Sequence, residues 1–99
     1  MRKHSTNLAA GRPVGATSFQ REPAKAFGQV LREARVKQGL SQEELGYIAG
    51  VPRNHVGNIE RGENLPTLGI VLKLSEALKI PAAELVAETE RILKLNKKT

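Results

Sequence analysis

The stretch GLSQEELGYIAGVPRNHVGNIER, from Gly39 to Arg61, contains the signals for two short helices and the turn between them. Ser41 and Glu44 have the capping-box spacing that starts a helix, because each side chain can bond the other residue's backbone N–H. Gly50 ends this helix, since glycine accepts the left-handed backbone found there. Pro52 opens the second helix, where its missing N–H costs nothing. The stretch therefore predicts two helices joined by a tight turn and packed nearly perpendicular to each other.

The apolar residues of this stretch recur at helical spacing and so mark the buried sides of its two helices. Gly46, in the middle of the first helix, provides the small residue that a close crossing needs. The residues that we expect to face inward are Leu45, Ile48, Ala49, Val56 and Ile59.

Three further helices are predicted on either side. One begins near Ala24 and ends at Gly39, and its apolar face holds Phe27, Val30, Leu31 and Ala34. Thr67 can cap another, and Pro81 starts the last. The helix after Thr67 is expected to be the most buried, because apolar residues surround it on most sides: Leu68, Ile70, Val71, Leu72, Leu74, Ala77 and Leu78. Five helices without a strand predict an all-α fold.

A chain of 99 residues can bury one modest core, so we expect a single domain. Residues 1–22 lack apolar periodicity and are rich in small and polar residues, which predicts a flexible basic arm. We expect residues 23–86 to form the globular domain, and residues 87–99 to extend the last helix into a basic tail.

The formal net charge of +6 is concentrated at the two ends of the chain. Residues 1–25 contain five basic residues and one glutamate, and residues 91–99 contain four basic residues and no acid. Residues 26–90 contain seven basic residues and nine glutamates, so the middle is net acidic. The tails can attract a polyanion, or they can serve only to keep the protein in solution. Any selective binding to an anion must come from individually placed residues in the middle.

Several classes of protein are disfavoured by composition. The chain contains neither cysteine nor aspartate, and no nucleophile, paired carboxylate or histidine cluster has the spacing of a catalytic or metal site. We therefore expect no enzyme activity, no cofactor and no bound metal. No apolar run is long enough to cross a bilayer or resembles a signal peptide, so we expect a cytoplasmic protein without a membrane partner.

The chain resembles the phage repressor and Cro type of helix-turn-helix protein, also called the XRE family. The resemblance covers residues 27–85 and rests on FGQVLREARVKQGLSQEELGYIAG, VPRNHVGNIERGENLPTLGIVLKLSEALKI and PAAEL. It implies a lambda-repressor-like fold and a sequence-specific, double-stranded DNA-binding transcription regulator, most simply a repressor or autoregulator. Such proteins read a palindromic operator in the major groove as a homodimer. An antitoxin of a toxin–antitoxin pair and the controller of a restriction-modification operon are the alternatives.

The polar face of the second helix is the candidate reader of bases. Arg53, Asn54 and Asn58 recur there at helical spacing, and the resemblance implies base contacts at these positions. Arginine can bind guanine O6 and N7, and asparagine can bind adenine N6 and N7. Gly57 lies between them, where it either permits close approach to DNA or is a neutral choice at an exposed position.

Candidate phosphate contacts lie around this face. The resemblance implies one at Gln42, where the helix N-terminus also offers N–H groups to an anion. Ser41 is expected mainly to cap the helix. Further candidates are His55, Arg61 and Asn64, although Asn64 can equally be a turn former. Arg12, within Gly11-Arg12-Pro13 of the arm, can enter a minor groove or belong to a plain flexible tail.

Two charges occupy otherwise inward-facing helical positions. Arg35 follows the apolar face of the first helix, and Glu60 follows Val56 and Ile59. In the resembling family such a pair joins the first and third helices, so we expect a largely buried, architectural salt bridge.

The last helix carries more apolar residues than one small core needs: Val86, Ile92, Leu93 and Leu95. They can form a homodimer interface, or they can close the core of the same domain.

Overall fold

The computed structural model describes residues 19–97, which form five helices and, over that range, no strand. The all-α prediction is therefore confirmed. The helices are α2 (Arg21–Lys37), α3 (Gln42–Ala49), α4 (Arg53–Glu60), α5 (Leu68–Leu78) and α6 (Ala82–Lys97). The arm residue Arg12 lies outside the described range.

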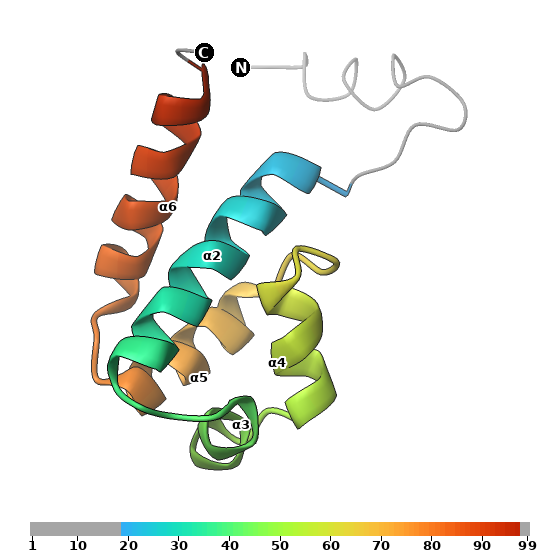
Figure 1. The fold of residues 1–99 in the computed structure, drawn as a ribbon, viewed down its shortest axis with the longest axis vertical. Helices are drawn as coiled ribbons and strands as arrows, with labels where there is room; N and C mark the ends of the chain where they lie inside the picture. Colours follow the sequence, from blue (N-terminus) through green and yellow to red (C-terminus); the bar gives the residue numbers. More distant parts are fainter. Residues whose placement is uncertain (1–18, 98–99) are drawn as a thin grey trace, which may run out of the picture.

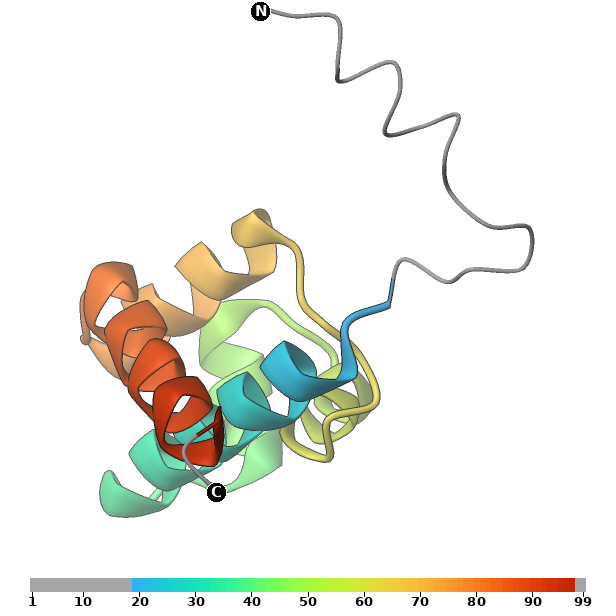
Figure 2. The same cartoon turned by 90° about the horizontal axis from the view of Figure 1, so that it is seen from above.

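Helix α2 is the centre of the arrangement (Figure 1). It packs against α6 along one side and against α4 on another, while α3 packs against α4 and α5. The view from above places α6 and α4 on opposite sides of α2 (Figure 2). The start of α4 is therefore left uncovered by the long C-terminal helix.

All five helices contribute to one hydrophobic core. The α2 helix supplies Leu31, α3 supplies Leu45 and α6 supplies Leu85. The largest side chains that are fully removed from solvent are Leu31, Leu45, Val56, Ile59, Leu74 and Leu78. A buried leucine or isoleucine stabilises a fold by about 1.5–3 kcal/mol relative to exposure, so these residues fix the relative positions of the helices.

The helix ends follow the local signals in the sequence. Ser41 and Glu44 form the reciprocal capping box, and the Thr67 hydroxyl accepts a hydrogen bond from the N–H of Ile70. Gly50 ends α3 with a φ of 73°, in the left-handed region. Lys79 adopts the same region at φ 59°, which the sequence did not predict.

Two predictions of burial were wrong. Ile48 was expected to face inward, but it is 56% exposed. Helix α3 crosses the following segment closely at Gly46, so that its buried side is the one with Leu45 and Gly46. Ile48 lies on another side of the helix and faces solvent. Helix α5 is less buried than α4, in which only Arg53 and Asn54 are exposed, because Leu68 and Leu72 of α5 are 70% and 50% exposed. Its neighbours α3 and α6 leave that side of α5 open to solvent.

Two glycines allow backbones to approach where no side chain would fit. A Cβ built on Gly46 would lie 2.4 Å from the carbonyl oxygen of Val51, so the small residue predicted in α3 is required by the turn. A Cβ on Gly28 would lie 2.3 Å from the carbonyl oxygen of Ile59. Gly28 thus permits α2 to cross α4 closely, a role that the sequence alone did not reveal.

Candidate functional site

The first two residues of α4 present their side chains to solvent. Arg53 and Asn54 are both exposed, and neither side chain makes a hydrogen bond or ion pair to another residue within 19–97. They follow Pro52, which sits at the helix start without a side-chain cap. Their donors and acceptors are therefore available to an external partner.

The third predicted base contact, Asn58, is in a different situation. It is half-buried, and its Oδ1 accepts a hydrogen bond from Nη2 of Arg61. Arg61 in turn forms an ion pair with Glu63, with 3.1 Å between Nε and Oε2. The structure therefore joins a predicted base contact to a predicted phosphate contact, and adds a carboxylate that the sequence did not single out.

At the start of α3, the two predicted phosphate contacts are tied to the protein. The hydroxyl of Ser41 accepts from the N–H of Glu44 at 2.9 Å, which completes the cap. The amide of Gln42 donates to Oε1 of Glu60 at 3.0 Å. The amide oxygen Oε1 of Gln42 would lie 3.5 Å from a Cβ built on Gly57. Gln42 is consequently held beside the middle of α4.

The remaining two predicted phosphate contacts lie together elsewhere. His55 and Asn64 are both half-buried and both line a shallow hollow with Phe19, Leu65, Pro66, Thr67 and Ile70. The structure thus separates the predicted site residues into the open start of α4, the group around Gly57, and this hollow.

A buried ion pair fixes α4 to α2. Nε and Nη2 of Arg35 donate to the two carboxylate oxygens of Glu60 at 2.7 Å and 3.0 Å, and the side chains are only 12% and 3% exposed. The pKa of Arg35 is raised above its ordinary value, chiefly because Glu60 accepts hydrogen bonds from the charged form, although burial opposes the shift. The guanidinium therefore stays charged throughout the ordinary pH range.

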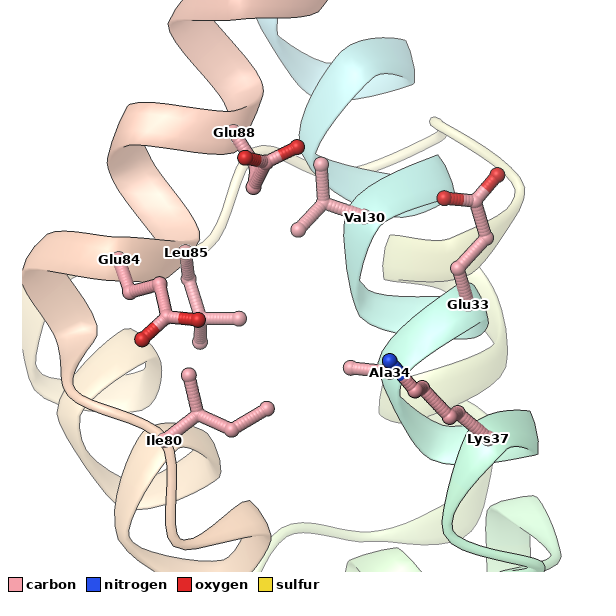
Figure 3. A pocket seen from close by; sticks show the side chains of 8 residues that line it. All are labelled: Val30, Glu33, Ala34, Lys37, Ile80, Glu84, Leu85 and Glu88. Carbon is pink, nitrogen blue, oxygen red and sulfur yellow. The ribbon is translucent and has the colours of Figure 1, made fainter.

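A second concave region has the wrong charge for an anionic partner (Figure 3). It is a groove of about 260 Å³ between α2 and α6. Its rim carries three carboxylates and one ammonium group, from Glu33, Glu84, Glu88 and Lys37. Because the net charge of that rim is negative, this groove would repel a polyphosphate backbone.

Other kinds of site find no support within the described part of the chain. No group of three or more histidine or acidic side chains there could hold a metal ion. None of the five helices is long and apolar enough to cross a membrane.

Comparison with known proteins identifies a family and individual relatives that are similar to this chain. The sequence profile of a family described as Helix-turn-helix matches residues 31–85. Among curated proteins, the chain is 38% identical over 64 residues to the cryptic phage CTXphi transcriptional repressor RstR of Vibrio cholerae. That match covers 65% of this chain and 58% of the repressor's length.

A control protein and a restriction-modification controller protein are also similar. The control protein C.BamHI of Bacillus amyloliquefaciens is 34% identical over 61 residues, which is 61% of this chain and 75% of that protein. The crystal structure of the controller protein C.AhdI from Aeromonas hydrophila superposes with a TM-score of 0.62 at 47% identity. It covers 63% of this chain and 94% of that one.

Proposed function

The chain belongs to the helix-turn-helix family, and from this premise we propose that it is a sequence-specific transcription regulator that binds double-stranded DNA. Helix α4 would enter the major groove, with α3 lying across the phosphate backbone. The observation that carries the proposal is the exposure of Arg53 and Asn54 at the start of a helix that buried contacts hold in place.

Base selection would begin with these two side chains. The Arg53 guanidinium can donate to both O6 and N7 of guanine, and the Asn54 amide can exchange two hydrogen bonds with adenine. Each such contact contributes about 1–3 kcal/mol of discrimination against a wrong base. Rigid placement matters here, because a side chain can select a base only if its helix enters the groove in one orientation.

Phosphate contacts would set that orientation. The N-terminus of α3, with Ser41 and Gln42, offers backbone N–H groups and a positive helix-dipole end to a phosphate. His55, Arg61 and Asn64 are the further candidates. The basic residues at the two ends of the chain add attraction that does not depend on sequence and that salt weakens.

A homodimer would double the number of bases read, with half-sites about one helical turn apart. Helix α6 is the candidate interface, since Val86 and Leu95 are 46% and 51% exposed. Ile92 instead packs against the hydrophobic core, and Leu93 is half-buried. The dimer proposal therefore rests on fewer apolar residues than the sequence suggested.

Control of a restriction-modification operon is a narrower candidate role. It is favoured by the similarity to C.AhdI, which extends over 94% of that controller at 47% identity. Repression alone is favoured by the similarity to RstR.

Selection of bound duplexes from a random pool tests the proposal. The intact protein should enrich one palindromic sequence, and Arg53→Ala or Asn54→Ala should each lose preference at one symmetric pair of positions. Arg32→Ala is the control, because Arg32 is an equally charged, exposed residue on α2. Equal binding to every duplex would contradict sequence-specific regulation.

A further inference from the structure

Gly57 explains how Arg61 reaches back along its own helix. Glycine is unfavourable inside a helix, yet Gly57 lies in the middle of α4 and is buried. A Cβ at this position would lie 3.0 Å from Nη1 of Arg61 and 3.8 Å from its Cζ. The side chains of Arg61 and Gln42 therefore cover Gly57, and the Arg61 guanidinium lies closest to the space that a Cβ would fill.

The guanidinium of Arg61 is held from two sides. Its Nη2 donates to Oδ1 of Asn58, one turn earlier on α4. Its Nε and Nη2 donate to the two carboxylate oxygens of Glu63 at 3.1 Å and 3.3 Å. The planar fork of arginine can make these contacts at once, whereas the single ammonium of lysine cannot match the same geometry.

We propose that Arg61, anchored by Glu63 and admitted by Gly57, is a positioning residue that sets which bases Asn58 accepts. This proposal rests on the proposed function and names the residue that determines which base is preferred at one position of the operator. Arg61 holds Oδ1 of Asn58 toward the protein, so that the Nδ2 amino group is the part of the amide presented outward.

This orientation changes what Asn58 can recognise. A two-bond contact with adenine requires the amide oxygen to accept from N6 while the amino group donates to N7. In this protein the Arg61 guanidinium already uses one of the two lone pairs of that oxygen, and its positive charge opposes the approach of a second donor. The amino group remains, and it pairs with O6 of guanine or O4 of thymine, whereas adenine presents its own N6 amino group in place of an acceptor; N7 is an acceptor on both purines and does not separate them.

Asn54 supplies an internal contrast. Its amide has no hydrogen bond to the rest of the described chain, so it remains able to bind adenine through both atoms. Two asparagines on the same helix would consequently prefer different bases, although their side chains are chemically identical. The identity of the residue alone does not give the preference.

The test is duplex selection with the intact protein and a set of single variants. Asn58→Ala first identifies the base position that Asn58 reads, as the one where preference disappears. At that position the intact protein should prefer a guanine or thymine acceptor. Arg61→Met should shift the preference toward adenine by at least about fivefold, the lower end of what one base contact contributes.

Two variants separate positioning from charge. Arg61→Lys keeps the charge and should fail to restore the preference, because it lacks the fork. Gly57→Ala keeps the arginine but crowds its guanidinium, and should shift the preference in the same direction. Arg91→Met is the matched control, since Arg91 is 59% exposed and pairs with a glutamate on α6, as Arg61 is 57% exposed and pairs with Glu63.

Three results would overturn the inference. Arg61 would be only a phosphate contact if Arg61→Met weakened all duplexes equally and lowered the salt slope by about one while preferences stayed the same. An Asn58→Ala variant that kept every preference would remove the base contact itself. These first two results leave the proposed function intact. The third result, an intact protein without any sequence preference, would refute the proposed function and the inference together.

Discussion

Arg35 of α2 and Glu60 at the end of α4 meet through two hydrogen bonds, and the carboxylate is also bound by Gln42 from the start of α3. The same guanidinium donates from Nη1 to the carbonyl oxygen of Leu40 at 2.7 Å. One buried ion pair therefore connects three helices and the loop between two of them. Because Glu60 of α4 is bound by both Arg35 of α2 and Gln42 of α3, these contacts hold α4 in a defined orientation relative to α3.

Removing one partner of this pair should be strongly destabilising. Arg35→Met leaves the Glu60 carboxylate buried without its counter-charge, which we expect to lower the free energy of unfolding in urea by about 3–5 kcal/mol. The double variant Arg35→Met with Glu60→Leu should recover much of that stability, because no charge is then stranded. A single variant as stable as the intact protein would show that the pair has no architectural role.

The crossing of α2 over α4 should not tolerate a side chain at Gly28. Gly28→Ala places a methyl group against the carbonyl oxygen of Ile59, and we expect a destabilisation of about 1–3 kcal/mol from overpacking. Gly69→Ala is the control, because the nearest atom to its Cβ is 3.8 Å away, on the capping residue Thr67. That change should stabilise the protein by up to about 1 kcal/mol through helix propensity. Equal effects of the two changes on thermal unfolding would contradict a close crossing.

The two helix caps should separate stability from DNA binding. Ser41→Ala and Thr67→Ala each remove a hydroxyl that accepts from a backbone N–H, so each should cost about 1 kcal/mol of stability. Only Ser41 lies at the helix end proposed to meet a phosphate. We therefore expect weaker DNA binding for Ser41→Ala alone, measured where both variants are fully folded. Equal affinities would argue against a phosphate at the start of α3.

A charge on α6 should dissociate the proposed dimer without unfolding the domain. Val86 is 46% exposed, so Val86→Glu should change stability by no more than about 0.5 kcal/mol while weakening self-association in analytical ultracentrifugation. Leu72→Glu on α5 is the control, at a similar exposure of 50%. Dissociation by Leu72→Glu and not by Val86→Glu would move the interface to α5.

Residues 2–18 should contribute attraction that is sensitive to salt. Deleting them removes three basic residues, Arg2, Lys3 and Arg12, and leaves α2 intact from Arg21. We expect weaker DNA binding and a shallower salt dependence, with the slope reduced by up to about 0.9 for each phosphate that these residues neutralise. Unchanged affinity and slope would favour a segment that serves only solubility.

Local sequence signals were sufficient to predict where several of the helices begin and end. Ser41 with Glu44, Thr67 and Gly50 act within one helical turn, so the sequence carries them without help from distant residues. The pairing of Arg35 with Glu60 was also predictable, because two charges on inward-facing positions need each other. Burial of single side chains was less predictable: Ile48 and Leu72 have the spacing of core residues, but no helix covers them.

Chemical types and approximate positions in the candidate site follow from the sequence, because helical spacing places Arg53, Asn54 and Asn58 near one another. The state of each side chain depends on contacts that spacing does not encode. Arg61 bends back over Gly57 to bind Asn58, and Glu63 holds it there. Local sequence signals are enough to define a capped helix, a glycine turn and a second helix that starts at a proline and carries a polar face. Packing in three dimensions decides which of those polar groups are open to a partner and which already have one, because their neighbours come from other turns and loops.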